Sequence, residues 1–196
     1  MSQATYTTTV KSGKGSRHGV VSELSAFLAI KPGEADELRA GLERFHARVR
    51  KAPWEVIAKI GIVDMKHVIF DDGTRLCWNT AFDTDWDPYI DDAVAILGAD
   101  AWTDWLQHTV GYETEDLSTG AAIKRYLQSA QCPATGFYRA IPDLTLTQVK
   151  QGQEVMTAFE EVLDTPGAAE ALQNPVFKPL LDKAAGSSHP PGRTPQ

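Results

Sequence analysis

Apolar residues in the first part of the chain recur at two spacings, every second residue and every third or fourth. The short apolar run 23–30 is closed by Lys31-Pro-Gly33, which predicts a strand followed by a turn. In residues 34–51 the apolar positions lie three and four residues apart. That segment begins with acidic residues and ends with basic ones, as the dipole of a helix favours. The sequence therefore predicts a strand and then an amphipathic helix.

A β-hairpin is predicted next. Residues 56–70 are rich in β-branched side chains, and residues 74–82 form a second apolar run of strand length. Asp71-Asp-Gly73 between the two runs favours a tight hairpin turn. We therefore expect two antiparallel strands joined at this turn.

Helical spacing returns after the hairpin. Asp87 and Pro88 suit the N-cap and the first turn of a helix over residues 89–97. Two further helices are predicted over residues 101–109 and 117–131 from their apolar periodicity. Three helical segments thus separate the hairpin from the last strand.

The last strand is predicted at residues 136–141, followed by a long helix over 145–163 and a short helix near 175–185. The order β-α-β-β-α-β, with a helical insertion at about residues 98–131, is that of a ferredoxin-like α+β domain with an antiparallel sheet. Helices cover one face of such a sheet. Its other face would be a large apolar patch, so we expect a second copy to cover it and form a homodimer.

Both ends of the chain lack an apolar period. Residues 1–20 are rich in Ser, Thr, Gly and Lys, and residues 185–196 in Ser, Gly and Pro. Such segments cannot bury enough apolar surface to offset the entropy lost on ordering. We expect both to be disordered, with a single domain over residues 21–184.

Composition narrows the classes of function. Hydrophobic residues make up 42% and charged residues 23%, as in a globular protein, and the net charge of −7 with no basic stripe argues against nucleic-acid binding. No apolar run is long enough to span a membrane, and residues 1–20 lack the apolar core of a secretory signal. Cys77 and Cys132 are predicted to be free thiols, which suits the cytoplasm.

One segment resembles a known superfamily. Residues 76–92, which end in Phe-Asp-Thr-Asp-Trp-Asp-Pro-Tyr-Ile-Asp-Asp, are similar to a segment of bacterial proteins of the dimeric α/β-barrel superfamily, as are Ala29–Gly33 and Tyr138–Asp143. Thr84 stands where that segment usually has glycine. The resemblance extends over roughly residues 22–145 and implies a ferredoxin-like fold and a dimer.

The superfamily is functionally mixed. It includes cofactor-free monooxygenases, polyketide cyclases, lactone isomerases, haem-degrading enzymes, chlorite dismutases and dye-decolourising peroxidases. The resemblance therefore implies fold and dimerisation more than activity, and it leaves the chemistry open.

His67 is the first candidate for chemistry. In the predicted strand it lies on the face opposite to Val68 and Phe70. If Val68 and Phe70 pack beneath the helices, His67 points into the barrel interior, where an imidazole could act as a general base or bind a metal or haem. The alternative is a structural histidine that hydrogen-bonds a neighbouring carboxylate or a partner subunit.

Asn79 and Tyr138, from other predicted strands, are candidates to join His67. Such a group suits proton abstraction and stabilisation of negative charge on the substrate. The first hypothesis is thus a cofactor-independent enzyme of the monooxygenase, cyclase or isomerase type. It would hold a small apolar or aromatic substrate in a barrel chamber, without a nucleotide.

The second hypothesis is a haem-binding, peroxidase-like oxidoreductase with His67 or His108 as the iron ligand. Trp78, Trp105, His108 and Arg139 are candidate ligand-binding residues in either case, although tryptophans at helical spacing are also typical of a core. No bound metal other than haem iron is expected.

The third hypothesis is a non-enzymatic ligand-binding or interaction module. Residues 83–92 are rich in aspartate, but Pro88 and Val94 stand where a calcium loop needs glycine and glutamate, so this segment is predicted to start a helix instead. Phosphate-binding glycine loops and hydrolase motifs are absent from the sequence.

Overall fold

The computed structural model describes residues 7–9, 15–112, 117 and 119–186. The chain divides into two compact units, residues 1–149 and 150–196, where the sequence predicts a single domain over 21–184. Within the described ranges, each helix is too short or too polar to cross a membrane.

An antiparallel sheet forms the centre of the N-terminal unit. Its strands within the described residues are β1 (Thr7–Thr9), β2 (Gly15–His18), β3 (Val21–Ala29), β4 (Ile62–Phe70), β5 (Arg75–Phe82) and β6 (Gln131–Cys132). The order is β1-β2-β3-β5-β4, and β6 pairs with β3. Strands β3, β4, β5 and β6 follow the ferredoxin-like pattern, in which the first strand of the motif lies between the third and the fourth. The predicted α+β, ferredoxin-like fold is confirmed.

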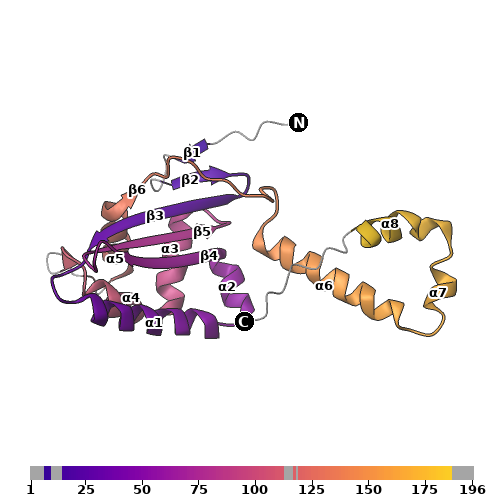
Figure 1. The fold of residues 1–196 in the computed structure, drawn as a ribbon, viewed down its shortest axis with the longest axis horizontal. Coiled ribbons are helices and arrows are strands. Elements are labelled where there is room, and N and C mark those ends of the chain that lie inside the picture. The colour runs from indigo at the N-terminus through magenta and orange to yellow at the C-terminus, as the bar shows by residue number, and fades with distance from the viewer. Residues whose placement is uncertain (1–6, 10–14, 113–116, 118, 187–196) are drawn as a thin grey trace. The chain divides into compact units, whose positions relative to one another are not determined.

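Helices α1 to α4 lie on one face of this sheet (Figure 1). Their bounds are α1 (Ala35–Lys51), α2 (Trp54–Ile60), α3 (Trp86–Leu97) and α4 (Ala99–Leu106), and α5 (Gly120–Ala130) leads into β6. The apolar sides of these helices and of the strands form one core. Its largest fully buried side chains are Phe45, Trp78, Phe82, Tyr89, Trp102 and Trp105.

The extended segment predicted for residues 56–70 is wrong over its first part. Residues 54–60 form α2, and β4 begins only at Ile62. Pro53 precedes the first turn of α2, and Gly61 ends it with a left-handed backbone (φ 78°) that glycine adopts readily. These end signals outweigh the β-branched side chains between them.

The fourth strand of the motif is not at residues 136–141, as predicted, but at the two-residue β6. Residues 136–141 are irregular, and Tyr138 among them is 75% exposed. The first residues of β3 already pair with β2, since Arg17 lies opposite Ser22. This leaves the later chain only the middle of that edge of β3.

Strand β2 lies inside the segment 1–20, for which the sequence predicts disorder. Its residues are polar, so its sequence carries no strand period, yet His18 is 4% exposed and its Nδ1 accepts a hydrogen bond from the backbone N–H of Arg139. Backbone pairing with β3 orders β2 without an apolar side chain. In the predicted disordered tail, residues 187–196 lie outside the described residues.

The long helix α6 (Leu146–Leu163) begins just before the boundary between the units. The C-terminal unit continues with α7 (Ala168–Ala171), the short 3-10 helix η2 (Pro175–Phe177) and α8 (Lys178–Gly186). The helices predicted at 145–163 and near 175–185 are confirmed. None of the described side chains of α6 is buried, so its apolar stripe remains on the surface.

A glycine tests the packing of α1 against α4. A Cβ built on Gly41 would lie 2.9 Å from the carbonyl oxygen of Asp104 and 3.3 Å from Cα of Trp105. Gly41→Ala should therefore lower the free energy of unfolding by about 1–3 kcal/mol, although alanine is the better helix former. In α6, Gly152→Ala meets nothing within 4 Å and should be neutral or stabilising. Urea unfolding followed by circular dichroism distinguishes the two, and equal effects would contradict a close α1–α4 contact.

Candidate functional site

His67 lies on the helix-covered face of the sheet. Opposite it in β5 is Trp78, which is fully buried and contacts Trp102 of α4 at a ring-centroid distance of 5.4 Å. Val68, on the other face, is 45% exposed. The condition that Val68 packs beneath the helices is therefore not met, and the expectation that His67 points into a barrel interior is wrong. Trp78 is the largest side chain on its face of the hairpin, and its burial determines that the helices cover this face.

His46 of α1 meets His67 across the gap between helix and strand. Nε2 of His46 lies 3.0 Å from Nδ1 of His67, within hydrogen-bond distance, and the two rings are nearly perpendicular. The rings of Phe45, Trp78 and Trp105 surround His67 at centroid distances of 6.0, 5.9 and 5.2 Å. The pair joins a half-buried histidine to a deeper one that is enclosed by aromatic rings.

Both imidazoles are neutral at pH 7. Burial, and then the neighbouring His46, lowers the pKa of His67 to about 3. Burial, and then the charge of Arg50, lowers the pKa of His46 as well. The hydrogen bond admits two tautomeric arrangements. When His46 donates from Nε2, its Nδ1 carries a free lone pair and can take up a proton.

The remaining nitrogen of His67, Nε2, is buried and has no hydrogen-bond partner among the described residues. In the tautomer that leaves His46 basic, this nitrogen carries a hydrogen. The ring of Trp105 lies 5.2 Å from the ring of His67, at an angle of 70° to it.

A groove between α1 and β4 opens beside the histidine pair and encloses about 370 Å³. Its residues are Arg39, Leu42, Glu43, His46 and Arg50 of α1 and Met65, Lys66, His67 and Ile69 of β4. Three apolar side chains, a neutral histidine pair and three cations against one carboxylate thus share one concave surface. Such a volume lies in the range of small-molecule sites.

The other predicted catalytic residues lie elsewhere. Asn79 is on the face opposite to His67, where its Nδ2 donates to Oγ of Ser25 at 2.9 Å and to the carbonyl oxygen of Leu24 at 3.3 Å. Tyr138 lies in the exposed segment after β6, in ring contact with His18. The structure therefore does not bring His67, Asn79 and Tyr138 together.

The predicted ligand-binding residues are also dispersed. Trp78 and Trp105 belong to the core, in line with the structural alternative. His108 follows α4, and its Nδ1 lies 2.9 Å from a carboxylate oxygen of Glu34. Arg139 donates through its side chain to the carbonyl oxygen of Ile141, two residues further on.

The surroundings of His67 do not fit a haem ligand. Nε2 of His67 is buried, and the ring of His67 is stacked with Trp78 at an interplanar angle of 4°. A porphyrin at Nε2 would have to displace the neighbouring indole rings of Trp78 and Trp105. At His108 the Glu34 carboxylate contacts Nδ1, which leaves Nε2 as a ligand atom, so His108 as an iron ligand stays a prediction.

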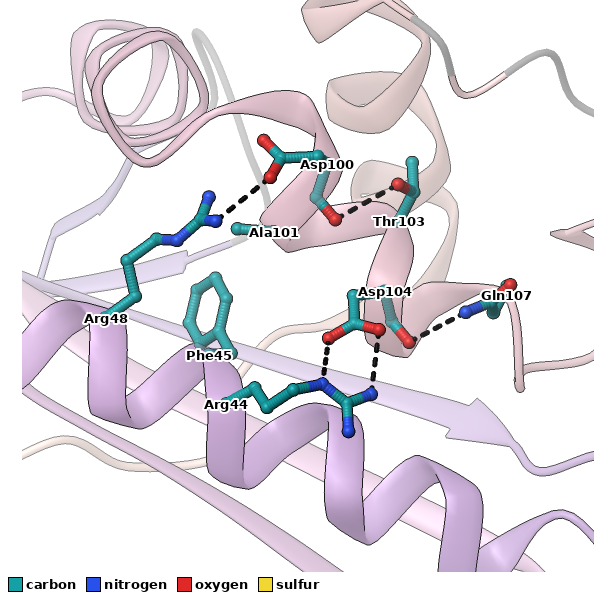
Figure 2. Close-up of a pocket in the computed structure, with 8 residues that line it drawn as sticks. All are labelled: Arg44, Phe45, Arg48, Asp100, Ala101, Thr103, Asp104 and Gln107. Carbon is teal, nitrogen blue, oxygen red and sulfur yellow. Dashed lines mark hydrogen bonds and ion pairs between the residues drawn. The ribbon is translucent and has the colours of Figure 1, made fainter.

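A second pocket, between α1 and α4, encloses about 430 Å³, and its polar groups contact one another. Figure 2 shows Arg44 clamped by both carboxylate oxygens of Asp104, each at 2.8 Å, and Arg48 paired with Asp100 at 3.0 Å. Arg48 also donates to the carbonyl oxygen of Leu97. These ion pairs hold α4 to α1, so this pocket has no comparable free donors for a ligand.

Sequence reasoning missed His46 and Arg50. His46 follows the buried Phe45 on a helix that is otherwise basic on its outer side, which is typical of a surface position. One signal was present, since Arg39, Glu43, His46 and Arg50 recur at four, three and four residues and so form a stripe along α1. The partner of that stripe, β4, could be identified only once the hairpin's faces were known.

No protein-family model matches this chain, and no curated protein matches it significantly. Among solved structures it is similar to a protein of Nitrosomonas europaea, whose assignment as an antibiotic biosynthesis monooxygenase is itself provisional. The identity is 15% and the TM-score 0.32, and the match covers 46% of this chain and 76% of the other. A likeness this low carries no functional argument, so the function proposed below rests on the groove.

Stability should depend on pH through His67. The pKa of His67 is about 3 in the folded chain and about 6.5 in an unfolded one. Between these values only the unfolded chain takes up the proton, so the free energy of unfolding falls as pH drops from 6.5 to 3, by up to about 1.4 kcal/mol per pH unit. His67→Phe should remove this contribution to the slope.

The measurement is urea unfolding of both proteins across this pH range. Carboxylates titrate in the same window in both, so the difference in slope belongs to His67. Parallel curves, or a His67 imidazole that becomes protonated near pH 6 by NMR, would contradict the buried neutral state.

Proposed function

We propose that this protein is a small enzyme that acts on a small organic molecule by proton transfer, without a nucleotide cofactor, in the α1–β4 groove. The observation that carries the proposal is the 3.0 Å contact between Nε2 of His46 and Nδ1 of His67 at the wall of a ligand-sized groove. His46 is the general acid–base group. His67 is a positioning residue, because it acts through His46.

The environment of the pair supports this assignment. A general base must be unprotonated before the reaction, and the lowered pKa of His46 ensures that at neutral pH. When His46 takes up a proton at Nδ1, its Nε2–H donates to His67, which fixes the tautomer and the ring orientation. The aromatic rings around His67 exclude water from the rear of the pair.

The groove also provides an apolar surface for the body of a substrate. Leu42, Met65 and Ile69 lie beside the histidines, so an apolar or aromatic group can be buried while an acidic C–H bond faces His46. The reaction class is therefore abstraction of a proton next to a carbonyl group, as in an isomerase or cyclase.

We further propose that the open face of the sheet binds a second copy of the chain. Phe27 and Val68 are 38% and 45% exposed and flank Cys77 in neighbouring strands. Alternation places Asp64 on the same face at one end, and Arg75 stands at the other end. Two copies that meet through this face, related by a two-fold axis running across the strands, bring Arg75 of each copy near Asp64 of the other. The face is then complementary to itself.

Deuterium exchange tests the chemistry. Small carbonyl compounds with an acidic C–H bond, phenylpyruvate and phenylacetone among them, are incubated with the protein in D2O, and loss of the benzylic proton signal is followed by NMR. His46→Gln should slow the catalysed exchange at least about a hundredfold, because a positioned acid–base group contributes that much. His108→Gln, which removes a histidine outside the groove, should exchange like the unaltered protein. If His46→Gln and His108→Gln behave alike, the groove is not the site.

Sedimentation velocity tests whether a second copy binds to this face. Val68→Asp should convert a dimer to monomers, with a dissociation constant raised by at least about a hundredfold, because a buried unpaired carboxylate is strongly unfavourable. Val176→Asp, at a 72% exposed valine of the C-terminal unit, is the matched control and should stay dimeric. A monomeric unaltered protein, or a dimer that survives Val68→Asp, would rule out this interface.

A further inference from the structure

The charges of the α1–β4 groove point to the kind of molecule it takes. Within the described part of the chain, Arg39, Arg50 and Lys66 make no ion pair, and Glu43 is the sole carboxylate that lines the groove. Arg44 and Arg48, on the neighbouring side of α1, are both paired with aspartates of α4. The protein carries a net charge of −7, so unpaired cations gathered at one groove run against its overall charge.

The cations differ in their distance from the histidine pair. Arg50 follows His46 by four residues, one helical turn or about 6 Å along α1. Its charge also contributes to the lowered pKa of His46, which places it within electrostatic reach. Lys66, next to His67 in β4, borders the groove, but alternation directs its side chain to the open face of the sheet, where its charge acts on Cys77.

Arg39 is placed less favourably. It precedes His46 by seven residues, about 10 Å along the helix. Glu43, four residues after Arg39 on the same stripe, offsets its charge. The positive end of the groove is therefore the end with Arg50.

We propose that the substrate is an organic anion whose acidic group binds Arg50, while its apolar body lies over Leu42, Met65 and Ile69. This inference rests on the proposed function, since it places the reacting C–H bond at His46. A guanidinium group matches the planar geometry of a carboxylate and binds it through two parallel hydrogen bonds.

The anion site also suits the reaction. Nδ1 of His46 takes the proton from carbon, and the electron pair of the C–H bond becomes the double bond of an enolate, with the negative charge on oxygen. Arg50 stabilises that charge as it forms. Return of the proton from His46 to another carbon or to oxygen completes an isomerisation without any oxidant or reductant.

Binding of an anion should in turn change His46. The bound negative charge offsets that of Arg50, so the pKa of His46 rises when the ligand is present. The base therefore becomes stronger only when the substrate is in place. This shift is a signature that a merely structural Arg50 would not produce.

The test compares phenylpyruvate with its methyl ester, which has the same body and no charge. Calorimetry measures affinity, and the NMR signal of the His46 ring measures its pKa. Phenylpyruvate should bind at least about tenfold more tightly than the ester, lose affinity as salt is raised, and raise the pKa of His46. Arg50→Gln should weaken phenylpyruvate binding at least about tenfold, and Lys66→Gln should weaken it less. Arg125→Gln, at an exposed arginine of α5 outside the groove, should have no effect.

Several results would overturn the inference. These are equal binding of acid and ester, equal affinity of Arg50→Gln and Arg125→Gln, and no binding of either compound up to about 10 mM. Inorganic phosphate binding as tightly as phenylpyruvate would show a site for charge alone, without the apolar body. If phenylpyruvate binds through Arg50 but undergoes no His46-dependent exchange, the anion site stands and the proposed reaction fails. If exchange depends on His46 but acid and ester react alike, the reaction stands and the anion site fails.

Discussion

The ring of Phe45 joins the helical layer to the sheet. Its centroid lies 5.0 Å from that of Trp102 in α4 and 6.0 Å from that of His67 in β4, both at steep interplanar angles. Edge-to-face aromatic contacts of this kind add stability beyond the area they bury. Because Phe45 fixes α1 over β4, the next residue, His46, comes to hydrogen-bond distance of His67. The site is therefore a consequence of core packing rather than of a loop placed over the core.

The buried face of α1 also separates the charged residues of this helix into two groups. Arg44 and Arg48 lie on the side towards α4, where Asp104 and Asp100 pair with them. The stripe on the other side, which includes His46 and Arg50, faces the edge strand β4, and this part of β4 offers the arginines no carboxylate. One helix thus holds α4 by ion pairs on one side and presents free charge to a groove on the other.

The sequence predicts those parts of the fold that have strong local signals. The Asp-Asp-Gly turn, the periodic helix at 34–51 and the long helix at 145–163 are such cases, and the order of strands and helices then favours the ferredoxin-like sheet. Strand β2 and the two-residue β6 were missed, because they depend on backbone pairing with β3 and not on their own side chains. His67 was identified as a candidate, but its surroundings were assigned to the wrong face. Alternation shows which residues share a face, and only tertiary packing decides which face the helices cover.

A phenylalanine at position 67 would suit the aromatic surroundings better than histidine does. It would avoid a buried nitrogen without a partner, and it would avoid the loss of stability that a neutral buried imidazole causes in acid. Residues that are unfavourable in their surroundings and do not improve the packing are concentrated at functional sites. On the open face, Asn79 already has two acceptors, and exposed Phe27 and Val68 suit burial against a second copy. The proposed chemistry is therefore better placed at the histidine pair. There His67, although its burial is unfavourable, holds His46 at the groove through a hydrogen bond.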